Sequence, residues 1–417
     1  MFRKLVLENG VRVVAERMPA LKSVTVGIWV NVGSRDEGPG EEGLSHFLEH
    51  MFFKGTSRRT ATDISRTIDA LGGELNAFTT RESTTFYVKV LDQHVAAAID
   101  LLADLFHHSR FDQKEIEKEK QVVLEEIRMV QDDPEDLVQD LHAEQVLAGH
   151  PLGRSILGEP ATIQSIRRRD LVDYINRHYQ PEETIIAIAG NFDHRDVLPL
   201  LRKAFGSFHR RAARHADRRP PTISGGVQAR RKPLEQAHLC VGLPGIAADR
   251  KERYAAHALN AILGGSVSSR LFQVIREDAG LAYSVYSYLS TYSDCGTLTV
   301  FSATRPREAG RVLRLIRREL TRMRSHGLTR AELARAKRHL KGSIMLSLDS
   351  TSSRMNKLAK DELFEGRHVP LDEVLARIDD VRSDRVIELA RQLIDFDRIG
   401  ITGLGPVSRG SLEAAFG

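Results

Sequence analysis

The order of the predicted secondary-structure elements occurs twice along the chain, once on each side of residues 209–233. Each time, a strand-like apolar segment leads into two helices, a pair of strands, further helices and a closing strand. The closing strands are "ETIIAIAGNF" at 183–192 and "IGITGLG" at 399–405. This repetition predicts an α+β fold built by internal duplication, with two structurally similar α/β-sandwich halves whose sheets are mostly antiparallel.

Residues 209–233 have the composition of a linker, because they are rich in Arg, Pro, Gly and Ser and show little apolar periodicity. A chain of 417 residues also exceeds one ordinary core, so two domains of about 200 residues each are expected. The sequence therefore predicts an N-terminal domain over 1–208, a linker over 209–233 and a C-terminal domain over 234–417.

The composition argues against several classes of protein. The net charge of +5 is the difference between 61 basic and 56 acidic residues, and no aromatic-plus-basic motif accompanies it. No apolar run approaches the ~20 residues that span a bilayer, and the N-terminus reads as a strand and turn instead of a secretion signal. Cys240 and Cys295 are too few for a disulfide framework. We expect a cytoplasmic protein that binds neither nucleic acid nor membrane.

The segment "LSHFLEH", residues 44–50, carries the first candidate for chemistry. His46, Glu49 and His50 have the i, i+3, i+4 spacing that places side chains on one helix face. Two imidazoles one turn apart can bind the same Zn²⁺, and the glutamate then lies beside the water of the metal. The alternative is a polar helix face without a metal, since this spacing also arises by chance.

A catalytic zinc commonly takes three protein ligands, so another element should supply one more. The glutamate-rich segment "EKEKQVVLEEI" (117–127) offers candidates, although such a helix is usually a solvated face. Glu125 and Glu126 directly follow an apolar run. Glu119 lies seven residues before Glu126 and shares its face, so this pair could supply a ligand and a supporting carboxylate. Spacing alone does not choose between Glu125 and Glu126.

Four separated motifs together carry a more specific signal than the histidine spacing alone. The motifs are "GLSHFLEHMFFKGT" (43–56), "GGELNAFTTREST" (72–84), "EKEKQVVLEEIRMVQDDPED" (117–136) and "SSRLFQVIREDAGLAYSVYSY" (268–288). They resemble the pitrilysin/insulysin-like metallopeptidase family, especially its mitochondrial-processing-peptidase and bacterial processing-protease branch. The resemblance covers almost the whole chain, in the expected order.

The resemblance implies one Zn²⁺ per chain, held by His46, His50 and Glu126, and thereby selects Glu126 over Glu125. Glu49 would be the general base, which takes a proton from the zinc-activated water and later delivers it to the leaving amine. Glu119 corresponds to a helper carboxylate in the family.

The segment "LNAFTT" (75–80) resembles the edge strand with which the family binds an extended peptide through its backbone. This implies that Asn76, Ala77, Phe78 and Thr79 bind substrate. The pattern by itself also fits an ordinary internal strand.

Arg276 and Tyr283 lie seven residues apart in "IREDAGLAY". They resemble an arginine–tyrosine pair with which the family binds carbonyl groups of the substrate. Without the resemblance, a salt-bridging arginine and a core tyrosine would explain the two residues equally simply.

The family architecture implies that the linker joins the two halves into a clamp, which closes over its substrate. We therefore expect a zinc endopeptidase that cleaves short or unfolded polypeptides in a closed chamber. Since both the zinc set and the Arg–Tyr pair are in one chain, a homodimer is expected; a heterodimer is possible. The alternatives are a non-catalytic scaffold subunit and a catalytic subunit that needs a different partner chain.

Overall fold

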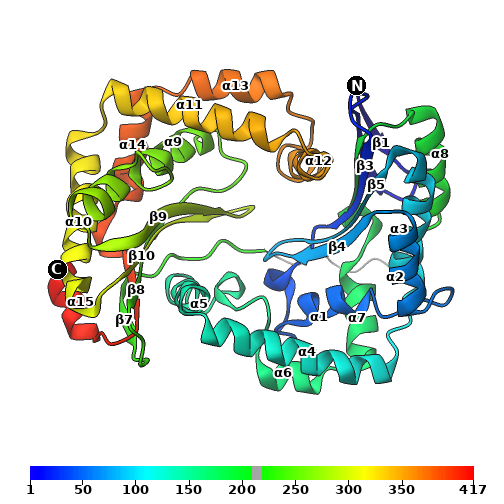
Figure 1. Ribbon diagram of the computed structural model, residues 1–417, viewed down its shortest axis with the longest axis horizontal. Coiled ribbons are helices and arrows are strands. Elements are labelled where there is room, and N and C mark those ends of the chain that lie inside the picture. Colours follow the sequence, from blue (N-terminus) through cyan, green and yellow to red (C-terminus); the bar gives the residue numbers. More distant parts are fainter. Residues whose placement is uncertain (209–217) are drawn as a thin grey trace. The chain divides into compact units, whose positions relative to one another are not determined.

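The computed structural model describes residues 1–208 and 218–417, which form two compact units (Figure 1). The first unit comprises Met1–Arg128, Arg154–Arg218 and Ser347–His368. The second unit comprises Met129–Gly153, Arg219–Leu346 and Val369–Gly417.

The first unit is built on a six-stranded sheet with the order β1-β2-β6-β3-β5-β4. Only β2 and β6 run parallel; the other neighbouring strands are antiparallel. Its first two strands form a hairpin around the predicted Asn9-Gly10 turn. The strands are β1 (Phe2–Val6), β2 (Arg12–Arg17), β3 (Ser23–Val30), β4 (Glu74–Thr79), β5 (Thr84–Leu91) and β6 (Thr184–Gly190).

Helices cover both faces of this sheet. The period-two alternation of β3 sends Val26 and Ile28 into the main core, whereas Trp29 points to the opposite face. There α12 (Thr351–Glu365) covers the sheet, and Trp29 Nε1 donates to Met355 Sδ at 3.2 Å. The other helices are α1 (Leu44–Met51), α2 (Ala61–Ala70), α3 (Val95–His108), α4 (Gln113–Asp132), α6 (Pro160–Ser165), α7 (Arg168–His178) and α8 (His194–Phe205).

The second unit repeats this arrangement on a five-stranded sheet with the order β7-β11-β8-β10-β9. Again one pair, β7 with β11, is parallel and the others are antiparallel. The strands are β7 (Gly226–Arg230), β8 (Ala237–Pro244), β9 (Ala282–Thr291), β10 (Gly296–Thr304) and β11 (Gly400–Leu404). The predicted fold class, two similar halves with mostly antiparallel sheets and helices, is confirmed.

One face of the second sheet packs against most helices of its unit, and α5 (Pro134–Val146) covers the other face. Leu137 and Val138 of α5 are buried against Cys240 and Phe301. A π-helix, η5 (Phe272–Asp278), precedes β9. The other helices are α9 (Arg253–Leu263), α10 (Ala309–His326), α11 (Arg330–Ser347), α13 (Leu371–Asp379), α14 (Ser383–Leu393) and α15 (Arg409–Phe416).

The compact units do not coincide with the predicted domains 1–208 and 234–417, because two helices are exchanged between the halves. Helix α5 precedes the predicted linker but packs in the second unit, and α12 follows it but packs in the first. Each exchanged helix covers an apolar sheet face. Hydrophobic periodicity predicts that such a helix has an apolar side to bury, but it does not show which of the two sheets the helix covers. Within the predicted linker 209–233, residues 226–230 form β7, and residues 209–217 lie outside the described residues.

Among the described residues, no helix is both long and apolar enough to cross a membrane. Of the two cysteines, Cys240 is fully buried in the core beneath α5, and Cys295 is half-buried.

Candidate metal centre

The orientation of α1 is determined by its apolar stripe. Leu44, Phe47, Leu48 and Met51 recur at the helical period and are almost completely buried in the core of the first unit. The positions between them, 46, 49 and 50, therefore face away from that core.

The start of α1 is fixed by a carboxylate from the preceding loop. Gly43, the N-cap residue, adopts a φ of 90° and has no side chain with which to cap the helix. Glu37 takes over this function, since its two oxygens accept hydrogen bonds from the backbone N–H groups of Gly43 at 2.9 Å and Ser45 at 2.7 Å. Because Ser45 directly precedes His46, the bond to Glu37 also helps to fix the position of His46 relative to the core.

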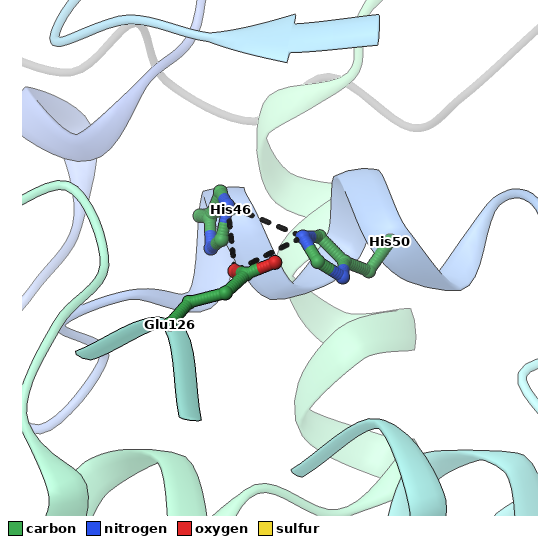
Figure 2. A group of neighbouring side chains, drawn as sticks. All are labelled: His46, His50 and Glu126. Carbon is green, nitrogen blue, oxygen red and sulfur yellow. Dashed lines mark hydrogen bonds and ion pairs between the residues drawn. The ribbon is translucent and has the colours of Figure 1, made fainter. Parts of the chain in front are cut away.

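Helix α4 brings one of its two candidate glutamates to the histidines. Glu126 Oε2 lies 3.7 Å from His46 Nε2 and 3.5 Å from His50 Nε2, and the two nitrogens are 3.3 Å apart. Figure 2 shows the three side chains pointing toward one another. Glu125 instead pairs with Arg128 at 2.7 Å, and its side chain is 63% exposed.

These three donors fit a zinc ion. Each offers a ligand atom, and all three atoms lie within 4.8 Å of one another. Tetrahedral ligands at ~2.0–2.1 Å from zinc would be about 3.3 Å apart, close to the observed separations. Burial, followed by the neighbouring His50, lowers the pKa of His46 to about 4, so its ring is neutral near pH 7. The neutral imidazole is the form that binds metals.

Glu119 contacts the site from behind His50. Its Oε1 lies 2.8 Å from His50 Nδ1, and its Oε2 lies 2.6 Å from Lys54 Nζ. Burial acts to raise the pKa of Glu119, but the hydrogen bonds from His50 and Lys54 outweigh it and leave the pKa lowered. The Glu119 carboxylate therefore holds the His50 ring in one orientation. The Nδ1–H of the ring points at Glu119, and its Nε2 points toward His46 and Glu126.

Sequence reasoning missed Lys54, which lies in the turn after α1. Its spacing of four residues from His50 is a weak signal, shared by many surface lysines. Its importance comes from Glu119, which is 4% exposed and would otherwise be a nearly buried charge with His50 as its only described partner.

Glu49, the predicted general base, is held by a residue of β4. Thr79 Oγ1 donates a hydrogen bond to Glu49 Oε2 at 2.5 Å. Burial raises the pKa of Glu49, and the bond from Thr79 partly opposes this effect. Glu49 is close enough to His50 and Glu126 for their charges to act on its pKa, and one of its carboxylate oxygens is already engaged by Thr79.

The strand that carries Thr79 is at the edge of the first sheet. Among the described strands, β4 pairs with β5 alone, in a register that places Asn76 opposite Tyr87. Ala77 faces the main core, whereas Phe78 packs at 5.5 Å against Trp29 on the face that α12 covers. The predicted edge position of residues 76–79 is found, and the alternative of an internal strand is wrong.

Arg276 and Tyr283 contact each other in the second unit. The guanidinium carbon of Arg276 is 4.3 Å from the Tyr283 ring centroid, and Nη1 donates to the Tyr283 carbonyl at 3.2 Å. Phe272, which the sequence did not single out, packs against the same guanidinium at 4.7 Å. Tyr283 is 80% exposed, so the alternative of a core tyrosine is wrong.

Comparison with known proteins identifies the family. Residues 12–160 match insulinase (peptidase family M16), and residues 165–340 match the peptidase M16 inactive domain. A Bacillus subtilis protein named uncharacterized zinc protease YmxG is 43% identical over 397 residues, which are 95% of this chain and 97% of its own. The chain belongs to peptidase family M16. The predicted resemblance to insulysin-like metallopeptidases is thereby confirmed.

Two further proteins are similar to the chain, one in sequence and one in fold. An uncharacterized zinc protease of Streptomyces coelicolor is 42% identical over 412 residues, 97% of this chain and 90% of its own. The crystal structure of a protease from Helicobacter pylori superposes with a TM-score of 0.90, covering 97% of this chain and 99% of its own. At 22% identity, the latter likeness concerns the M16 fold alone.

Substitutions on α4 should separate a zinc ligand from its supporting carboxylate. Glu126→Ala removes a donor, and we expect the zinc affinity to fall more than ~100-fold. Glu119→Ala frees the His50 ring, with an expected loss of about 10- to 100-fold. Glu125→Ala, on the exposed side of the same helix, is the control and should leave the affinity unchanged. Competition with a chromophoric chelator measures each value.

Equal losses in the Glu125→Ala and Glu126→Ala variants would contradict the ligand assignment. Circular dichroism of each variant with excess chelator shows whether the apo fold is retained, so that a lost ligand is distinguished from a misfolded chain.

Proposed function

We propose that this chain is a zinc-dependent endopeptidase that hydrolyses peptide bonds of short or unfolded polypeptides. The observation that carries the proposal is the convergence of His46, His50 and Glu126 near Glu49, whose pKa responds to the charges of His50 and Glu126. One Zn²⁺ per chain would be held by the three converging side chains. Family membership and the zinc-protease names of the relatives support the same chemistry.

The chain itself supplies the proton transfer of the proposed reaction. Bound zinc would lower the pKa of a coordinated water to about 7 and polarise the peptide carbonyl. Glu49 accepts a proton from the attacking water on one carboxylate oxygen and then delivers it to the amine that leaves. The raised pKa of Glu49, which burial causes, suits a group that must both accept and return a proton.

The supporting groups keep the ligands in the form that the reaction requires. Glu119 fixes the tautomer of His50 by accepting its Nδ1–H. Lys54 balances the charge of Glu119, so the carboxylate stays ionised despite its burial. In this proposal Glu119 and Lys54 position the site without contacting the substrate.

An extended peptide would bind along the free edge of β4. The backbone of residues 76–79 has β5 on one side and no described strand on the other, so N–H and C=O groups on its outer side can pair with a substrate strand. The Ala77 N–H donates to Asn76 Oδ1 at 2.8 Å and would have to leave this partner to bind a peptide. Pairing through the backbone gives weak preference for particular side chains. Arg276 and Tyr283 would add donors for carbonyl groups of the peptide.

The alternative of a non-catalytic scaffold subunit is disfavoured because the donor set and Glu49 are all present and grouped. A scaffold would not require three metal donors beside an acid.

Glu49→Gln tests the mechanism directly. The amide keeps the size of the side chain but is a poor proton acceptor, so we expect peptide cleavage to fall at least ~100-fold. Zinc content should remain that of the wild type. Hydrolysis of an unfolded peptide mixture, with and without a chelator, is the measurement, and Glu125→Gln is the matched control. Undiminished cleavage by purified Glu49→Gln protein would show that the proposed mechanism is wrong.

Tyr283→Phe tests whether the Tyr283 hydroxyl donates a hydrogen bond to a carbonyl group of the peptide. The ring over Arg276 is kept and the hydroxyl is lost, so we expect kcat/KM for peptides to fall about 10- to 100-fold with zinc content unchanged. Tyr254→Phe is the control, because Tyr254 also stacks with an arginine, Arg253, at 4.9 Å. Equal kinetics of the Tyr283→Phe and Tyr254→Phe variants would remove Tyr283 from the proposal.

We further propose that the active form is a cytoplasmic homodimer, because one chain carries both the metal donors and the Arg–Tyr pair. Native mass spectrometry of the chain purified alone should show two copies and about two zinc ions, together with peptidase activity. An inactive preparation that a second, different protein activates would instead support the heterodimer. Cell fractionation tests the location.

A further inference from the structure

The hydroxyl of Thr79 joins the candidate general base to the edge strand. Thr79 is the last residue of β4, and its Oγ1 donates to Glu49 Oε2 at 2.5 Å. The two residues are thirty positions apart in sequence and come from a strand and a helix. Both side chains are half-buried, so solvent competes little for this bond.

The end of β4 that carries Thr79 is fixed by the turn that directly follows it. After Thr79 the chain turns through residues 80–83, where Thr80 N–H donates to the Ser83 carbonyl at 2.8 Å. The backbone N–H groups of Ser34 and Arg35 donate to the carbonyls of Thr80 and Arg81 at 3.3 and 2.8 Å. The turn is therefore tied to the segment that follows β3.

Ion pairs with little exposure to solvent reinforce this attachment. Arg218 donates to both carboxylate oxygens of Asp36, at 2.9 and 2.8 Å, and to the Glu82 carbonyl at 3.2 Å. Arg35 pairs with the Glu82 carboxylate at 2.7 Å. Bidentate and charge-assisted bonds of this kind are among the strongest in proteins. Here Arg35 and Glu82 are buried, and Asp36 and Arg218 are half-buried. The position of Thr79 is consequently set by the body of the first unit.

We propose that Thr79 is a positioning residue for Glu49, an inference that rests on the proposed peptidase function. Rotation of a glutamate carboxyl about its last torsion is soft. A bond from a fixed hydroxyl to Oε2 leaves Oε1 as the oxygen that receives the proton. In the proposed step the O–H bond of the attacking water breaks and the Oε1–H bond forms, while the hydroxyl proton stays on Thr79.

The same residue also gives the edge strand a second function. The backbone of β4 is the proposed site of peptide pairing, and the side chain of its last residue holds the base. A peptide that pairs with β4 would therefore be placed relative to Glu49 through a single residue. The expected role is in the rate of proton transfer and not in the affinity for peptide or zinc.

Thr79→Val and Thr79→Ser test this inference. Valine keeps the shape and loses the hydroxyl, so we expect kcat to fall about 10- to 100-fold, with KM within about threefold of wild type and unchanged zinc content. Serine keeps the hydroxyl and should restore kcat to within about threefold of wild type. Thr67→Val is the control, since its hydroxyl bonds to the carbonyl of Asp63 in its own helix. Thr79→Ala repeats the comparison if valine lowers the melting temperature.

The outcomes separate this inference from the proposed function. If the hydroxyl acts through Glu49, removing it from the Glu49→Gln protein should cause no further loss, which a double-mutant cycle shows. Wild-type kcat in Thr79→Val, while Glu49→Gln is inactive with zinc bound, would overturn the inference alone. Equal losses in the serine and valine variants, or a loss of zinc, would also overturn it. Activity in Glu49→Gln would instead reject the proposed function.

Discussion

The packing of one short helix determines the chemistry of the first unit. Helix α1 buries Leu44, Phe47, Leu48 and Met51, and this stripe leaves positions 46, 49 and 50 facing away from the core. Rotating the helix by one residue would place polar side chains in the core and cost several kcal/mol. The direction of the two imidazoles is therefore maintained by apolar contacts that take no part in any reaction.

Around this helix, several polar groups of the site are held by residues outside it. Glu37 caps the first turn, Glu119 and Lys54 fix His50, and Thr79 fixes Glu49. These contacts come from a loop, a long helix, a turn and an edge strand. A donor group of this kind is preorganised, because its members need not rearrange when a metal or substrate binds.

Sequence patterns predicted the local part of this arrangement and missed the long-range part. Helix geometry was enough to predict that His46, Glu49 and His50 share one face of α1. The repeated order of strands and helices was enough to predict two similar α+β halves. The choice of Glu126 over Glu125 required the family resemblance, because it depends on how Ile116, Val123 and Ile127 seat α4 in the core. The contacts of Lys54 and Thr79 join residues distant in sequence, and no periodicity marks them.

The exchange of α5 and α12 between the two halves has a consequence for how the chain is made. During synthesis the first sheet is complete once residue 190 has emerged, yet Val14, Trp29 and Ile185 remain exposed on one face until α12 follows some 160 residues later. While these residues are synthesised, the nascent chain carries an uncovered apolar surface, a state in which aggregation competes with folding. Helix α12, which covers this apolar surface, is among the last elements of the chain to be synthesised.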